Sequence, residues 1–194
     1  FNSIRNYRDF TQRVPVSSYE DYQNLIERSR KGEKNIFWPK PINWFAKSSG
    51  TTSAKSKFIP VSADSLEDCH YAAGKDLLCM YLNNNENSTL FNGKNLRLGG
   101  SKELYEENGT TFGDLSAILI DNMPLWAEFS STPGNKVSLM SDWEYKMQAI
   151  VNETINENVT SLAGVPSWML VLLNNVLEST GNKNILDVWP NLEV

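Results

Sequence analysis

The sequence predicts an α/β fold in which a layered mixed sheet is flanked by helices. Short apolar runs that are typical of strands alternate along the chain with longer segments whose apolar residues recur at helical spacing. The composition agrees with this prediction, because 40% of the 194 residues are hydrophobic and 21% are charged. A chain of this length can bury one sizeable core. We therefore expect residues 1–194 to belong to a single domain.

The charge balance and the hydrophobic pattern argue against two classes of protein. The net charge of -5 and the calculated pI of about 5.0 are unlike those of a nucleic-acid-binding protein, which needs a broad basic face. No window approaches roughly eighteen consecutive apolar residues, so we expect no membrane-spanning segment. No signal peptide is recognisable either. These features predict a cytoplasmic protein that binds neither nucleic acid nor membrane.

The two cysteines, Cys69 and Cys79, are expected to be free thiols. They lie on one predicted helix, where a separation of ten residues is too long for a disulfide between them. We expect both thiols to be reduced and to lie in the core.

The first predicted helix begins after Ser17 and ends near Gly32. Ser17 and Glu20 have the spacing of a capping box, and the helix carries an apolar stripe. This stripe contains Tyr19, Tyr22, Leu25 and Ile26. Two short apolar segments, 44–46 and 58–61, follow the helix and are expected to be strands on either side of a polar loop.

A second helix is predicted from Ser62, a good N-cap residue, to about Leu82. Apolar residues recur along one face of it at helical spacing. They are Leu66, Cys69, Ala73, Leu77 and Met80. We expect this face to pack in the core.

The remaining elements continue the alternation of strands and helices. A strand at 96–98 runs into Gly99 and Gly100, which either let another group approach closely or form a simple turn. Asp114 is expected to cap the next helix, and a capping box at Ser141 and Glu144 to open another. The other predicted elements are the end of that helix near Asn158, a strand at Val159–Val165, a helix at Ser167–Ser179 stopped by Gly181, and strands at Ile185–Trp189 and Asn191–Val194.

The polar loop from Lys47 to Lys57 is the stretch most indicative of a binding site. It combines small hydroxyl residues and one glycine with lysines, and no acidic residue occurs between Lys40 and Asp64. Backbone N–H groups, hydroxyls and ammonium ions around a tight turn suit a polyphosphate. A flexible Ser/Thr-rich linker is the alternative. The loop is not a Walker A motif, because Lys55 stands where that motif requires glycine and no helix follows at once.

The loop also resembles the phosphate-binding motif of adenylate-forming enzymes, most closely that of the auxin-responsive acyl-acid amido synthetases of plants and their bacterial homologues. Ala54 departs from the motif, since the plant enzymes usually have glycine there. Further segments resemble the bacterial branch in order and spacing, so the resemblance covers nearly the whole chain. These segments are Trp38-Pro39, Trp44-Phe45-Ala46-Lys47, Gly164-Val165-Pro166-Ser167-Trp168 and Trp189-Pro190-Asn191.

This resemblance implies a fold and an activity. The chain would be the N-terminal portion of the large adenylation domain, an incomplete domain without the C-terminal half and the small C-terminal domain. The enzyme would join ATP and a carboxylic acid into an acyl-adenylate, release pyrophosphate, and pass the acyl group to an amine such as an amino acid. ATP and Mg²⁺ are the implied cofactors. Lys57 would be the catalytic cation, and it would bind the phosphates together with Ser48, Ser49, Gly50, Thr51, Thr52 and Ser53.

The acid is expected to lie between the helix that starts at Ser62 and segment 164–168, because ligands of α/β folds bind beyond the carboxyl ends of strands. The candidate residues are Val165, Pro166, Trp168 and His70. Trp168 could instead plug the sheet, and His70 could be a partly buried structural histidine. We expect no metal site built from side chains, because Cys69 and His70 diverge on a helix and lack further ligands.

Two other functions remain open at this point. The chain could belong to a ligase that passes the acyl group to coenzyme A, or it could be a module that binds nucleotide or phosphate without chemistry. The sequence does not identify the acid, the acyl acceptor or the oligomeric state.

Overall fold

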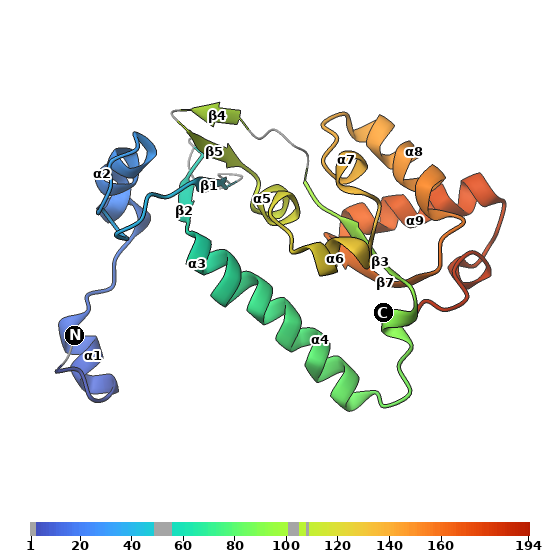
Figure 1. The fold of residues 1–194 in the computed structure, drawn as a ribbon, viewed down its shortest axis with the longest axis horizontal. Helices are drawn as coiled ribbons and strands as arrows, with labels where there is room; N and C mark the ends of the chain where they lie inside the picture. The colour runs from blue at the N-terminus through green and yellow to red at the C-terminus, as the bar shows by residue number, and fades with distance from the viewer. Residues whose placement is uncertain (1–2, 49–55, 101–104, 108) are drawn as a thin grey trace.

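The computed structural model describes residues 3–48, 56–100, 105–107 and 109–194. It confirms the predicted α/β class: helices surround two small sheets, which lie side by side along the long axis of the molecule (Figure 1). In the described residues the first sheet has the strand order β2-β1-β5-β4, and the second has the order β6-β3-β7. None of the helices in these ranges is long and apolar enough to cross a membrane.

The first sheet is built around β1, Trp44–Lys47. This strand pairs antiparallel with β2, Phe58–Val61, and parallel with β5, Thr110–Gly113. Strand β4, Tyr105–Glu107, completes the sheet beside β5. Phe45 and Phe112 are fully buried and stack with their ring centroids 5.4 Å apart, so adjacent strands share one aromatic core.

Helix α2, Tyr19–Arg30, covers this aromatic core and follows the short helix α1, Tyr7–Arg13. Its capping box is formed by Ser18 and Asp21, one residue later than predicted, because two overlapping pairs in the sequence have the required spacing. The predicted pair, Ser17 and Glu20, is therefore wrong. The shift leaves the Glu20 side chain available for a contact outside the helix.

The helix predicted from Ser62 is present, with Ser62 accepting a hydrogen bond from the backbone N–H of Ser65. It consists of α3 (Ala63–Ser65), a π-helical turn (Leu66–Tyr71) and α4 (Ala72–Asn84). The predicted buried face is wrong beyond Leu66, since the side chains of Leu77 and Met80 are 68% and 65% exposed. A π turn inserts an extra residue and rotates the following helix face by about 100°.

Both cysteines lie on this helical segment, and both are free, as predicted. Their expected place in the core is wrong, because both are exposed. Cys69 belongs to the apolar stripe whose predicted burial is wrong, and Cys79 lies on α4 outside that stripe.

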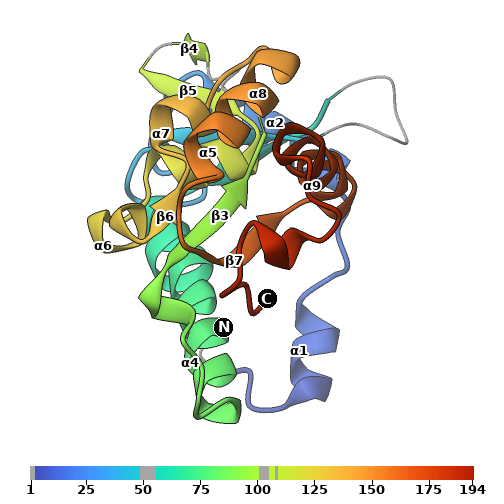
Figure 2. The ribbon, with the colours of Figure 1, turned by 90° about the vertical axis from the view of Figure 1, so that its right-hand side faces the viewer.

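The second sheet holds the main hydrophobic core. Strand β3, Lys94–Leu98, runs parallel to β6, Ser131–Thr132, on one side and to β7, Val159–Gly164, on the other (Figure 2). Helices α8, Trp143–Thr154, and α9, Pro166–Thr180, pack against it. Two short helices, α5 (Leu115–Asp121) and α6 (Leu125–Phe129), lead from the first sheet to β6, and a third, α7 (Asn135–Ser138), lies between β6 and α8.

The ends of these helices test several predictions. Asp114 takes the expected N-cap position of α5, although its side chain makes no capping hydrogen bond. Gly181, with a φ of 71°, ends α9, as expected. The capping box predicted at Ser141 is replaced by Asp142, whose side chain accepts a hydrogen bond from the N–H of Tyr145 at 2.9 Å.

The C-terminal segment differs from the prediction. The first predicted strand is instead a short 3-10 helix, Ile185–Asp187. Trp189 is fully buried, and its indole N–H donates to the carbonyl of Thr154 at 3.1 Å. The segment 191–194 forms no regular strand, although it lies along β7, where the N–H of Leu162 donates to the carbonyl of Val194 at 2.7 Å.

Candidate functional site

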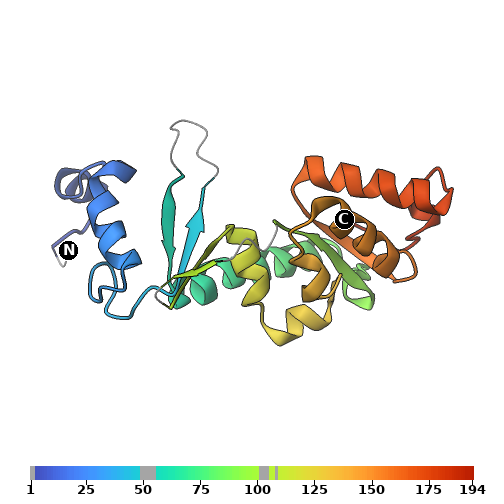
Figure 3. The ribbon, with the colours of Figure 1, turned by 90° about the horizontal axis from the view of Figure 1, so that it is seen from above.

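The predicted phosphate loop joins the ends of β1 and β2, which run side by side as a hairpin (Figure 3). At the base of this loop Ser48 and Lys57 face each other, and the N–H of Ser48 donates to the carbonyl of Lys57 at 2.9 Å. The N–H of Lys57 donates in turn to Oγ of Ser48 at 3.3 Å. The candidates Ser49, Gly50, Thr51, Thr52 and Ser53 lie outside the described residues. The structure therefore places only the base of the loop.

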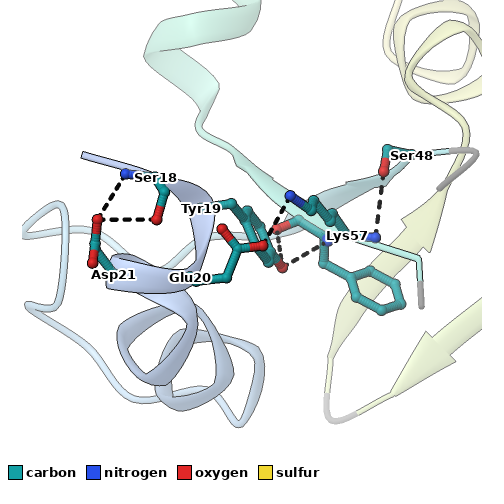
Figure 4. A network of polar contacts seen from close by, with 7 residues as sticks. Ser18, Tyr19, Glu20, Asp21, Ser48 and Lys57 are labelled. Atoms are coloured by element: carbon teal, nitrogen blue, oxygen red, sulfur yellow. Dashed lines mark hydrogen bonds and ion pairs between the residues drawn. The ribbon is translucent and has the colours of Figure 1, made fainter. Parts of the chain in front are cut away.

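The Lys57 side chain points toward helix α2 (Figure 4). Its Nζ lies 3.0 Å from Oε1 of Glu20 and 4.9 Å from the ring centroid of Tyr19. The Lys57 side chain is 34% exposed and that of Glu20 is 62% exposed. The hydrogen bond from Lys57 is the main cause that lowers the pKa of Glu20, so the carboxylate stays ionised at neutral pH and balances the ammonium charge.

Tyr19 fastens the same helix to β2. Its hydroxyl accepts a hydrogen bond from the N–H of Phe58 at 3.0 Å and lies 3.3 Å from the carbonyl oxygen of Phe58, to which it donates. The guanidinium of Arg30 lies 3.9 Å from the Phe58 ring centroid. Because β2 is at the edge of the sheet in the part of the chain that the structure describes, these contacts satisfy backbone groups that no described strand covers.

Sequence reasoning missed the part that Tyr19 and Glu20 take in this site. The sequence pattern predicts Tyr19 on the apolar stripe of the helix and Glu20 in a capping box. The sequence does contain a second pair with capping-box spacing, Ser18 and Asp21. If that pair caps the helix, the Glu20 side chain is left for another contact. No local pattern connects Glu20 to Lys57, since they are brought together by the docking of α2 on the hairpin.

The second predicted region lies at the carboxyl end of β7. Gly164 ends that strand where a Cβ atom would lie 2.8 Å from the carbonyl oxygen of Leu98, so only glycine lets β3 and β7 approach this closely. Val165 is the N-cap residue of α9 and Pro166 its first residue. Trp168 packs edge-on against Trp143, with ring centroids 5.2 Å apart, and stays 36% exposed.

His70 lies elsewhere, in the wall of an apolar cavity of about 500 Å³. This cavity is bounded by α4, by the segment around α6 and by residues 161–163 of β7. Val165, Pro166 and Trp168 are not among its lining residues. The structure thus brings His70 close to β7 but does not join it with the other three candidates in one pocket.

Lys146 is a buried cation that sequence reasoning also missed. Its Nζ donates to the carbonyl oxygens of Gly99 and Gly100 at 2.8 and 3.2 Å, and the residue is 1% exposed. Burial lowers the pKa of Lys146 to about 8. Gly100 is held further by its N–H, which donates to Oγ of Ser116 at 2.9 Å. These contacts fix the carboxyl end of β3, so we assign Lys146 a structural role.

Comparison with known proteins gives one family. Residues 1–194 match the family model described as the GH3 family N-terminal domain. The indole-3-acetic acid-amido synthetase GH3.17 of Arabidopsis thaliana is 38% identical over 64 residues, which are 32% of this chain and 10% of that protein. The probable indole-3-acetic acid-amido synthetase GH3.2 of Oryza sativa subsp. japonica is 42% identical over 59 residues, again 10% of its length.

Solved structures agree with this match at the level of the fold. The AtGH3.15 acyl acid amido synthetase in complex with 2,4-DB superposes with a TM-score of 0.68 at 24% identity. A second structure of the GH3.15 acyl acid amido synthetase has a TM-score of 0.69 at 23% identity. Each alignment covers 92% of this chain but only 31% and 32% of the solved chains. The chain therefore spans about a third of these relatives.

Proposed function

The chain belongs to the GH3 family, and we propose that the protein is an ATP-dependent acyl-acid amido synthetase in which this chain holds the phosphates of ATP. In the proposed reaction a carboxylic acid attacks the α-phosphate of ATP, pyrophosphate leaves, and an amine such as an amino acid takes the acyl group. The observation that carries the proposal is the family match over residues 1–194, together with the hairpin base at Ser48 and Lys57.

The roles of the loop residues follow from charge. Lys57 would neutralise the negative charge that grows on the leaving pyrophosphate. The Ser48 hydroxyl lies beside the backbone of Lys57 and would donate to a phosphate oxygen. Ser49, Gly50, Thr51, Thr52 and Ser53 would supply further donors and the tight turn between them. Holding the triphosphate in line with the acid is the second task of the loop.

Mg²⁺ fits this part of the chain only as an ion that arrives with the phosphates. In the ranges that the structure describes, no three His, Cys, Asp or Glu side chains gather into a metal site. Mg²⁺ commonly keeps several waters and binds through substrate phosphates. When bound, it would share the neutralisation of phosphate charge with Lys57.

The acid substrate belongs to the same proposal. Two places are open to it: the apolar cavity with His70 in its wall, and the exposed segment with Val165, Pro166 and Trp168. Both lie at the second sheet, so an acid bound in either place would have to reach the phosphates from that side. We also propose a cytoplasmic location, in keeping with the two free cysteines.

The proposal is tested by acid-dependent exchange of label between pyrophosphate and ATP, measured on the natural protein with a panel of carboxylic acids. We expect Lys57→Ala to lower the exchange rate by about a hundredfold or more, as loss of a charge-stabilising group commonly does. Lys40→Ala is the matched control, because Lys40 is an exposed lysine whose nearest partner, Asp64, is 3.9 Å away. It should leave the rate unchanged.

Two outcomes would contradict the proposal. Wild-type protein that catalyses no exchange with any acid would favour a binding module. Exchange followed by acyl transfer to coenzyme A, with no transfer to amines, would favour an acyl-CoA ligase.

A further inference from the structure

Glu20 forms an ion pair with Lys57, the cation that the proposed reaction needs. The Glu20 carboxylate lies 3.0 Å from the Lys57 ammonium, and the hydrogen bond between them is the first cause of the lowered pKa of Glu20. At this separation the two unit charges largely cancel for any third group nearby. A phosphate that approaches Lys57 therefore meets a neutralised pair instead of a free cation.

The packing of α2 on the hairpin does not depend on this ion pair. Tyr19 already bonds both backbone groups of Phe58, and Arg30 lies over the Phe58 ring. Ser48 and Lys57 are joined by a backbone hydrogen bond and by a second bond from the N–H of Lys57 to Oγ of Ser48. Glu20 is 62% exposed at its side chain, and ion pairs with that much solvent contact contribute little to stability. Anchoring the helix is thus a weak explanation for Glu20.

A polyphosphate would displace the carboxylate readily. It carries several negative charges and many acceptor oxygens, whereas Glu20 offers a single charge in a solvent-exposed position. A lysine ammonium on its flexible stem can turn from one acceptor to another without moving the backbone. The Tyr19 ring beneath the Lys57 ammonium is held by two hydrogen bonds to Phe58, so such a turn of the lysine needs no movement of helix α2.

We propose that Glu20 is a positioning residue that holds the Lys57 ammonium when no polyphosphate is bound and competes with polyphosphate for it. The inference rests on the proposed function, since it assigns Lys57 to the phosphates. Glu20 weakens polyphosphate binding, and its ion pair with Lys57 forms again when pyrophosphate leaves. Its removal therefore strengthens binding, which is the opposite of what loss of a structural contact does.

The test is isothermal titration of the natural protein with inorganic tripolyphosphate. Glu20→Gln keeps the size of the side chain and removes its charge. We expect it to bind tripolyphosphate about two- to fivefold more tightly, the range that corresponds to one exposed ion pair. Glu33→Gln is the matched control: it removes the same charge just beyond α2, where the partner of Glu33 is Arg28, and it should leave affinity unchanged.

The effect must also require Lys57. Lys57→Ala should bind tripolyphosphate more weakly than wild type, and adding Glu20→Gln to it should give no gain, as a double-mutant cycle demands of a direct pair. In steady-state assays Glu20→Gln should lower the KM for ATP while kcat stays equal or falls, because pyrophosphate leaves more slowly.

The outcomes separate this inference from the proposed function. If Lys57→Ala weakens binding but Glu20→Gln binds equally or less tightly than wild type, competition by Glu20 is wrong and the phosphate site stands. If Glu20→Gln strengthens binding equally with and without Lys57, the gain is a general charge effect and the inference is also wrong. If neither wild type nor any variant binds tripolyphosphate, both proposals fall.

Discussion

The buried ammonium of Lys146 predicts a specific dependence of stability on pH. Burial lowers the pKa of Lys146 from 10.5 to about 8 in the folded protein. Between these two values the unfolded chain binds more protons than the folded one, so the free energy of unfolding rises with pH. Below about pH 8 both states are protonated and the contribution is constant. Above 10.5 both are neutral and the burial of charge no longer opposes folding.

The magnitude follows from the shift. One pKa unit corresponds to about 1.4 kcal/mol, so the full shift is worth about 3 kcal/mol. Roughly 2 kcal/mol of it should develop between pH 8 and pH 10. The neutral amine retains two N–H donors, which are enough for the carbonyl oxygens of Gly99 and Gly100. Deprotonation therefore removes the buried charge without breaking either hydrogen bond.

The assay compares urea unfolding of wild type and Lys146→Met at pH 8, 9 and 10. Wild type should gain stability relative to the variant by about 2 kcal/mol over this range. The comparison with the variant cancels the contributions of the other titrating groups, which both proteins share. Lys136→Met, at an exposed lysine of α7, controls for the loss of one surface charge. A stability difference that stays flat from pH 8 to 10 would contradict a lowered pKa of Lys146, because the ammonium would then keep its charge over this range.

Two further predictions concern packing and completeness. Gly164→Ala should lower the free energy of unfolding, measured with urea, by about 1–3 kcal/mol. Its Cβ would lie 2.8 Å from the carbonyl oxygen of Leu98, so β3 and β7 would have to separate. Gly74→Ala is the control, because a Cβ there meets nothing within 4 Å; it should be neutral or stabilising by up to about 1 kcal/mol. Residues 1–194 expressed alone should not release pyrophosphate from ATP and acid at a normal enzymatic rate, because they align with only about a third of each solved relative. Turnover comparable to that of the natural protein would contradict this prediction.

Most elements of the fold could be predicted because their signals are local. The helix after Ser62, the strand that begins at Val159 and the stop at Gly181 all depend on caps, periodicity or glycine within a few residues. The two errors in helix capping arose where two local solutions compete. The capping boxes at Ser17 and Ser141 each had a neighbour one residue later that the structure uses instead.

The buried face predicted for α4 is wrong for a different reason. Periodicity assumes an uninterrupted helix, and the π turn at Leu66–Tyr71 breaks that assumption. The predicted strand at Ile185–Trp189 is a short 3-10 helix and turn because Trp189 inserts into the core and bonds Thr154. A tertiary contact of this kind overrides strand propensity.

What the sequence alone determined is the α/β class, the order of most helices and strands, and a hydroxyl-rich loop between two short strands ending at Lys57. These depend on interactions between near neighbours, which a single sequence displays directly. Other features come from the packing of distant elements: Glu20 and Tyr19 contact Lys57, Lys146 is buried away from water, and His70 lies apart from Trp168. Each of these depends on which elements pack together, because charge neutralisation and desolvation are set by distance in space.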